Sequence, residues 1–200
     1  HASKIGYDIN GSVVFTRDAL DHQKSTSYAD SFSDGVNRNT FAYPTTSTDA
    51  DGFSSYVKYN FDFGATTRTE GPPPAGQTQG VVQTFSYYSN SVQLERVTTA
   101  NNGAFKRFWY GPYYTGSYAS VNNLADESYA VQFFDGLGRV FANSSNFPGS
   151  SGGYKAQFTI YDQMGQAIKV SNPTEIDAGG TAYGDDAAGW RIRQRLQHEQ

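Results

Sequence analysis

Hydrophobic and polar residues alternate along short segments of this 200-residue chain, and glycine, asparagine or proline separates the segments. Residues 167–170 show the period of two that places successive side chains on opposite faces of a β-strand. Residues 93–99 and 105–110 form two further strand-like segments, and Asn101-Asn102-Gly103 between them predicts a tight turn. The pattern therefore predicts an all-β chain built from antiparallel hairpins.

One short motif recurs within this pattern. An aromatic residue, an Asp, two further residues and a Gly precede an alternating strand at 7–11, 134–138 and 161–165. Weaker copies begin at Phe61 and Tyr88, which are 27 positions apart, as are the copies at 134 and 161. The step from Tyr88 to Phe134 is 46 positions, so the pattern indicates degenerate tandem copies of one structural unit with loops of variable length.

Each copy is expected to form a hairpin. In the turn, the Asp side chain can accept hydrogen bonds from the backbone, and Gly supplies a positive φ. A single hairpin is marginally stable in water, so the copies must stack in a shared sheet. Such a sheet can curl into a barrel or a half-shell.

The other segments indicate loops and a tail. Residues 71–76 and 143–153 are rich in Gly, Pro, Ser or Asn and are expected to be loops. A short C-terminal helix is predicted, because Asp185-Asp186 can cap its start and no Gly or Pro follows Trp190 to interrupt it. We therefore expect a hairpin domain over 1–184 and a helical tail over 185–200.

The motif copies resemble the YD repeat of the Rhs and teneurin family, in which Tyr-Asp, two residues, Gly and Arg precede an alternating strand. The copy Phe134–Arg139 matches this pattern with Phe in place of Tyr, whereas Gln166 and Ser12 replace the Arg in two others. The repeat-turn residues on which the resemblance rests are Tyr7, Asp8, Gly11, Phe134, Asp135, Gly138, Arg139, Tyr161, Asp162 and Gly165.

The resemblance implies a ribbon of β-hairpins that, in large family members, spirals into a hollow shell around a C-terminal domain. It also implies export or display at the cell surface. This chain is far too short to close such a shell, so the resemblance implies a segment or a small derivative of a longer repeat protein.

The aromatic run 105–114 is the main candidate for ligand binding. Strand alternation places Phe108 and Tyr110 on one face and Arg107 and Trp109 on the other. Arg107, Trp109, Tyr113 and Tyr114 are the candidate residues for stacking on a sugar or on a protein partner. The alternative is that these rings form cross-strand ladders that stabilise the sheet.

Composition narrows the function classes. The formal net charge of -4 argues against nucleic-acid binding, and no apolar stretch is long enough to span a membrane. The chain has no cysteine, and its three histidines lack metal-ligand spacing, so no metal or cofactor is expected. Asp49-Ala50-Asp51-Gly52 is similar to the start of a calcium loop, but the later ligands are missing.

Two functions follow from these observations. The favoured one is a non-catalytic β-repeat module, secreted or at the cell surface, that binds carbohydrate or a protein partner. Its sheet edges would also allow self-association. The alternative is a small secreted glycoside hydrolase with paired carboxylates, although Asp126-Glu127 and Asp185-Asp186 are adjacent and would point to opposite faces of a strand.

Overall fold

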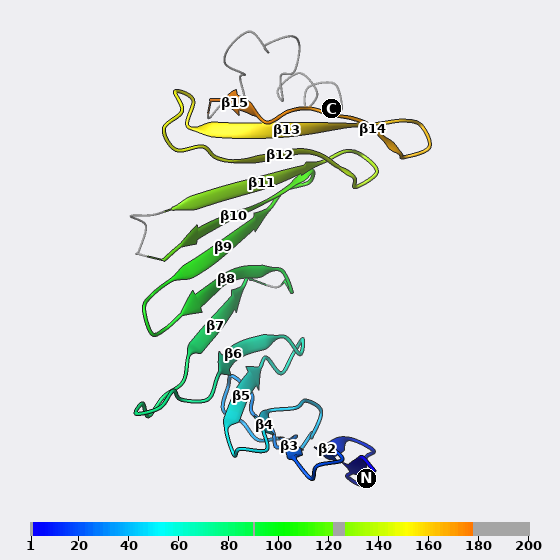
Figure 1. Cartoon of the computed structure of the whole chain (residues 1–200), viewed down its shortest axis with the longest axis vertical. Coiled ribbons are helices and arrows are strands. Elements are labelled where there is room, and N and C mark those ends of the chain that lie inside the picture. Colours follow the sequence, from blue (N-terminus) through cyan, green and yellow to red (C-terminus); the bar gives the residue numbers. More distant parts are fainter. Residues whose placement is uncertain (1, 90, 122–126, 178–200) are drawn as a thin grey trace. The chain divides into compact units, whose positions relative to one another are not determined.

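The computed structural model describes residues 2–89, 91–121 and 127–177, and this part of the chain is all-β, as predicted (Figure 1). It contains 15 strands and no helix. The C-terminal helix expected over 185–200 lies outside the described residues. The strands are β1 (Lys4–Tyr7), β2 (Val13–Arg17), β3 (Gln23–Ser27), β4 (Thr46–Thr48), β5 (Ser54–Tyr59), β6 (Thr66–Glu70), β7 (Val82–Tyr87), β8 (Leu94–Thr99), β9 (Phe105–Tyr110), β10 (Tyr114–Ser120), β11 (Ser128–Phe134), β12 (Val140–Asn146), β13 (Tyr154–Tyr161), β14 (Ala167–Val170) and β15 (Thr174–Ile176).

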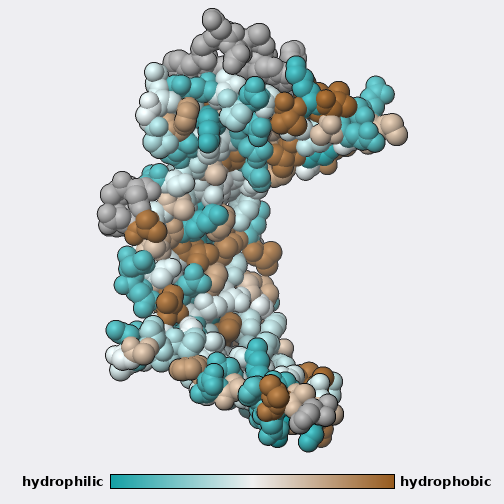
Figure 2. All heavy atoms as spheres, in the orientation of Figure 1, coloured by the Kyte–Doolittle hydropathy of each residue, from teal (hydrophilic) through white to brown (hydrophobic). Residues whose placement is uncertain are grey.

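The strands form one open antiparallel sheet in which β1 to β14 follow one another in chain order. The last strand, β15, pairs with β13 on the same side as β14. Contacts within the chain group into two compact units, His1–Phe105 and Lys106–Gln200, and both are built from hairpins. Hydrophobic side chains form small patches among hydrophilic ones on the face shown in Figure 2.

The first unit has little buried apolar surface. Phe32 and Val82 are its buried hydrophobic residues in the described part of the chain. Phe32 contacts Phe61 edge to face at 5.3 Å between ring centres, and the Arg38 guanidinium lies 4.0 Å from the centre of the Phe61 ring. Aromatic and cation–π contacts of this kind add specific attraction to simple burial, so this unit depends on ring contacts more than on a large core.

The second unit has a continuous core on one face of its sheet. Phe141, Ala142, Ala156, Phe158 and Ile176 are buried together, and they come from β12, β13 and β15. The strands β11, β12 and β13 are also among the longest, with seven, seven and eight residues. Among the described residues, this unit therefore holds most of the buried hydrophobic core.

Five hairpin turns share one geometry, and each begins with an Asp. The Asp N–H donates to the carbonyl of the residue four positions later, and the residue at the fourth position of the turn donates its N–H to the Asp carbonyl. The Asp carboxylate accepts further backbone N–H groups inside the turn. The turns begin at Asp8, Asp18, Asp49, Asp135 and Asp162.

The residue at the fourth position of each turn has positive φ. Gly138 and Gly165 have φ of 77° and 83°, which confirms the prediction that they are equivalent. Asp21 occupies this place in the Asp18 turn with φ of 71°. The Asp49 segment, which is similar in sequence to a calcium loop, is a hairpin turn of the same kind.

A β-bulge follows the turn in five hairpins, and it pairs with an aromatic residue. Those residues are Tyr7, Tyr59, Tyr87, Phe134 and Tyr161. The sequence alignment of the two weak copies on Phe61 and Tyr88 was therefore wrong by one or two positions. In the first of these, Asn60 replaces Asp as the turn acceptor and the loop is one residue longer, so the aromatic position moves back to Tyr59.

A tyrosine hydroxyl connects successive hairpins. Tyr161 Oη donates to the Val140 carbonyl at 2.8 Å, and Tyr87 Oη donates to the Thr66 carbonyl at 2.6 Å. Val140 and Thr66 hold the same place, because each pairs with the aromatic residue of the preceding hairpin at its bulge. We call this contact the tyrosine latch. The latch thus gives a backbone carbonyl beside each bulge a hydrogen-bond donor from the next hairpin.

Gly138 and Gly136 provide a matched test of the turn geometry. Replacing Gly138 by Ala should lower the free energy of unfolding by about 1–2 kcal/mol, because Ala is strained at positive φ. Gly136 lies in the same turn outside the left-handed region with open space around it, so Gly136→Ala should be neutral or slightly stabilising. Urea denaturation of both variants measures the difference, and equal losses would contradict the shared turn.

Removing the latch hydroxyl should also cost stability. Tyr161→Phe keeps the ring but leaves the Val140 carbonyl without this donor, so the free energy of unfolding should fall by about 0.5–1.5 kcal/mol. Tyr113→Phe, which removes a hydroxyl from an exposed turn residue, is the control and should change stability little. Equal melting temperatures for the two variants would argue against a stabilising latch.

Candidate functional site

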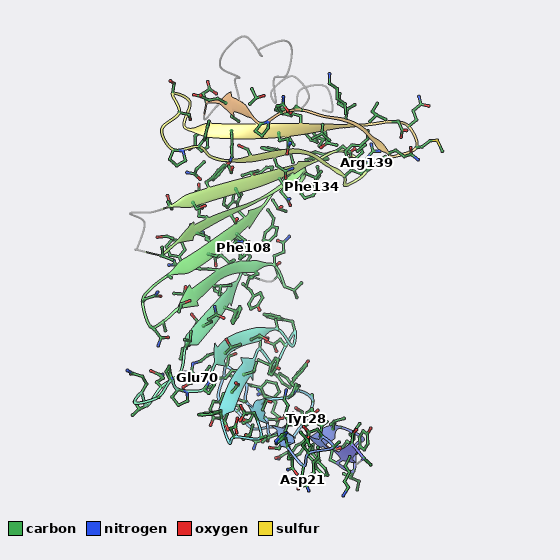
Figure 3. The ribbon with its side chains drawn as sticks, in the orientation of Figure 1. Asp21, Tyr28, Glu70, Phe108, Phe134 and Arg139 are labelled. Carbon is green, nitrogen blue, oxygen red and sulfur yellow. The ribbon has the colours of Figure 1, made fainter. Side chains whose placement is uncertain are left out.

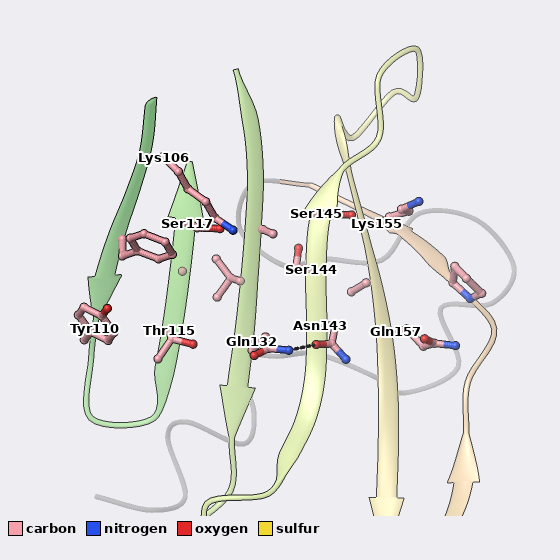
Figure 4. Close-up of a pocket in the computed structure, with 16 residues that line it drawn as sticks. Lys106, Tyr110, Thr115, Ser117, Gln132, Asn143, Ser144, Ser145, Lys155 and Gln157 are labelled. Atoms are coloured by element: carbon pink, nitrogen blue, oxygen red, sulfur yellow. Dashed lines mark hydrogen bonds between the residues drawn. The ribbon is translucent and has the colours of Figure 1, made fainter. Parts of the chain in front are cut away.

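A groove of about 610 Å³ crosses one face of the second unit and is lined by polar side chains (Figure 4). Strands β9 to β13 supply most of its floor. The lining residues are Lys106, Phe108, Tyr110, Thr115, Gly116, Ser117, Ala130, Val131, Gln132, Asn143, Ser144, Ser145, Lys155, Ala156, Gln157 and Pro173. We call this surface the polar groove.

Strand register creates two rows of polar side chains along the floor of the groove. Thr115, Gln132, Asn143 and Gln157 are cross-strand neighbours in one row from β10 to β13. Ser117, Ala130, Ser145 and Lys155 form the second row across the same strands. With about 4.8 Å between strands, each row is about 14 Å long. The groove is therefore long enough for an extended ligand.

The amide side chains of the first row make hydrogen bonds within the protein. Gln132 Nε2 donates to Asn143 Oδ1 at 3.2 Å (Figure 4), and Gln157 Nε2 donates to the Ser171 carbonyl at 3.0 Å. A primary amide carries both donors and an acceptor, so each retains capacity for a ligand after making one such bond. Ordered amides of this kind suit a ligand with many hydroxyl groups.

Two lysines and two aromatic rings complete the groove. Lys106 projects from β9 and Lys155 from β13, on opposite sides of the groove (Figure 4). Phe108, labelled on β9 in Figure 3, and Tyr110 lie on the same strand face as Lys106. The lining, which consists entirely of described residues, includes no Asp, Glu or His. The groove can therefore attract an anionic ligand, but its lining has no carboxylate pair for acid–base catalysis.

The predicted ligand residues lie outside this lining. Trp109 packs against Tyr118 and Tyr129 on the opposite face, with ring centres 4.6 Å and 5.6 Å apart. Gly116 lies beneath the Trp109 ring, where a Cβ would collide with it. Burial, together with Tyr118 and neighbouring tyrosines, raises the pKa of the Tyr129 hydroxyl. Trp109 thus belongs to a cross-strand aromatic ladder, which is the alternative that the sequence left open.

The other three predicted ligand residues also differ from the groove residues. Tyr114 packs against Phe133, with ring centres 6.2 Å apart, on the sheet face that carries Trp109. The exposed Tyr113 lies in the turn before Tyr114. Arg107 is exposed and alternates with the groove residues along β9. Sequence analysis missed the groove because its Ser, Thr, Asn and Gln residues come from four strands. Only the register shows that they are neighbours. The prediction that 143–153 form a loop was also wrong for 143–146, which lie in β12.

The predicted repeat-turn residues form a structural network rather than a ligand site. Arg139 donates from Nε to Asp135 Oδ2 at 2.7 Å, and its guanidinium lies 4.6 Å from the centre of the Tyr161 ring. Phe134 and Arg139 lie in the β11–β12 hairpin (Figure 3), whereas Tyr161 belongs to the next hairpin. Arg139 therefore connects two successive copies of the motif. Tyr7, Asp8, Gly11, Asp162 and Gly165 occupy the equivalent places in their own hairpins.

The Asp135 carboxylate is shifted by this network. Burial raises its pKa, but the hydrogen bonds from the Arg139 side chain and from the Arg139 and Leu137 backbone outweigh burial and hold the pKa below its usual value. Its ionised form is therefore preferred in the folded protein, and the hairpin is stabilised by that charge.

Comparison with protein-family models and with curated proteins finds no match to this chain. In the described residues, no helix has the length and apolar character needed to cross a membrane.

The Asp135 network predicts an acid-dependent loss of stability. Because the folded-state pKa is lowered, the contribution is complete above about pH 4 and is lost as the pH falls through the lowered value. Asp135→Asn can keep the backbone hydrogen bonds at Oδ1 but removes the charge. Between about pH 5 and 2, the melting temperature of the wild type should fall more steeply than that of the variant. Parallel curves would contradict this role of Asp135.

Proposed function

We propose that this chain is a non-catalytic β-repeat module, of the YD-repeat kind, that acts outside the cell or at its surface and binds carbohydrate in the polar groove. The observation that carries the proposal is the pair of cross-strand rows that bring amide, hydroxyl and lysine side chains together on one face of the sheet. Amides and hydroxyls match the hydroxyl groups of sugars, and rings at the groove end match their apolar faces.

The length of the groove favours a polymer over a single sugar. The polar rows extend over four strands, and β9 adds Phe108 and Tyr110 at one end. A ligand that bound along this path would contact several sugar residues at once. Each contact is weak, so a useful affinity requires several of them.

The two lysines favour a glycan with carboxylate or sulfate groups. Lys106 and Lys155 lie on opposite sides of the groove, and its lining adds no opposing carboxylate among the described residues. Glu175 pairs with Lys155 across β13 and β15, but its carboxylate accepts the Gly152 N–H and is outside the groove lining. Because both lysines are exposed, binding should weaken as salt concentration rises.

Asn143 and Gln163 form a matched pair of variants for testing this site. The chain is titrated with soluble neutral and acidic polysaccharides, with affinity measured by calorimetry at two salt concentrations. Asn143→Ala should weaken binding about fivefold, the value of one hydrogen bond. Gln163→Ala, an exposed change in the β13–β14 turn, should leave the affinity unchanged.

Charge variants test the acidic class separately. Lys155→Gln should reduce binding of acidic glycans more than binding of neutral ones, whereas Lys169→Gln outside the groove should not. Absence of binding to any polysaccharide, or binding that Asn143→Ala does not change, would overturn the proposed site. Reducing sugar released in the same samples, and abolished by one Asp or Glu substitution, would favour the hydrolase alternative instead.

A further inference from the structure

The tyrosine latch also defines the register between successive hairpins. Tyr161 latches to Val140, and Ala142 pairs with Phe158. The residue two positions after the acceptor, Ala142, therefore pairs with the residue three positions before the tyrosine, Phe158.

Two other latch contacts follow the same rule, the second of them between β2 and β3, which the Asp18 turn joins directly. Tyr87 latches to Thr66, and Arg68 pairs with Thr84. Tyr28 Oη donates to the Val13 carbonyl at 3.2 Å, and Phe15 pairs with Ser25. Three latches therefore give one register, although the residues that pair differ in each case. The latch and the strand pairing form a single recognition unit.

The first described hairpin carries the donor side of this recognition unit, a tyrosine next to the strand edge of β1. Tyr7 holds the aromatic position and is 60% exposed, and β1 pairs only with β2 in the described residues. The Asp8 N–H points into its own turn, so strand alternation directs the Tyr7 N–H away from β2. The equivalent N–H of Phe134 donates to the carbonyl of Tyr113, in the turn just before the neighbouring strand β10. Tyr7 therefore has two outward-facing donors, its hydroxyl and its backbone N–H. These are the groups with which the other hairpins bind the strand that precedes them.

The last described hairpin has the complementary half. Ala167 pairs with Tyr161 at the bulge, so it holds the place of Val140 in the preceding hairpin. In the described residues, β14 pairs only with β13. Ile168 and Val170 on this strand are 64% and 56% exposed. An exposed strand edge with apolar side chains is a template for pairing with another strand.

We propose that copies of this chain associate head to tail, with β1 of one copy pairing antiparallel to β14 of the next. Tyr7 of the first copy donates the latch hydrogen bond to the Ala167 carbonyl of the second. The register rule places Ile5 opposite Ile168 and Lys4 opposite Lys169. The two edges differ, so the contact is not self-complementary, and successive copies can add without an intrinsic limit of two.

The lysine pair makes the association weak and dependent on salt. Like charges directly opposite each other on a sheet oppose pairing, and salt screens that repulsion. Each strand is also only four residues long, so the contact area is small. This inference is independent of the polar groove, because neither β1 nor β14 contributes to its lining.

Charge exchange at the lysine pair is the sharpest test. Sedimentation equilibrium of the full chain should show an average mass that rises above 21.9 kDa with concentration, and more strongly at high salt. Lys4→Glu should tighten association about threefold to fivefold at low salt and reverse the salt dependence, because Glu then faces Lys169. Adding Lys169→Glu to this variant should cancel the gain. Lys58→Glu makes the same charge change on β5, away from both edges, and is the control.

Tyr7→Phe tests the latch itself. It should weaken association about fivefold, the value of one hydrogen bond, while the melting temperature of the dilute chain stays unchanged. A single species of 21.9 kDa under all conditions would overturn the proposal. Association that stops at a dimer, or that none of the edge variants changes, would assign the contact to another surface and would also overturn it.

Discussion

The capped Asp turn is the constraint on which the structure depends. Its carboxylate satisfies backbone N–H groups that the tight turn removes from the ladder, and a residue with positive φ completes the turn. The bulge that follows fixes which residues pair across the hairpin. Because side chains alternate along a strand, a shift of one residue would exchange the aromatic and polar faces of the second unit. Among the groove strands, the Asp135 turn therefore sets the register between β11 and β12.

Contacts between hairpins extend this local order. The latch of Tyr161 to Val140 and the stacking of Arg139 on Tyr161 both join one motif copy to the next. Such contacts matter in a sheet with a modest core, because each hairpin contributes too little buried surface to be stable alone. In the other copies Ser12 and Gln166 replace the Arg, and the ion pair with Asp135 has no direct counterpart there. The connection between hairpins thus varies in strength along the chain.

The two faces of the second unit have different physical roles. One face buries Phe141, Phe158 and Ile176 and stacks Trp109 on Tyr118. The other presents amides, hydroxyls and lysines in the polar groove. The side chains of the aromatic run 105–114 therefore lie on both faces. Trp109 packs against other rings of the sheet, whereas Phe108 and Tyr110 line the groove. A side chain rich in contact area can serve stability as readily as binding.

The local sequence pattern is enough to predict the all-β class, the hairpins and the turn role of Asp135 and Gly138, because these depend on interactions among a few neighbouring residues. It placed two weak copies on Phe61 and Tyr88 instead of Tyr59 and Tyr87, since an extra loop residue changes the bulge without changing the local pattern. The tertiary structure alone decided that Gln132 meets Asn143 and that Trp109 covers Gly116. Those contacts depend on register between strands distant in the chain, which no local pattern encodes.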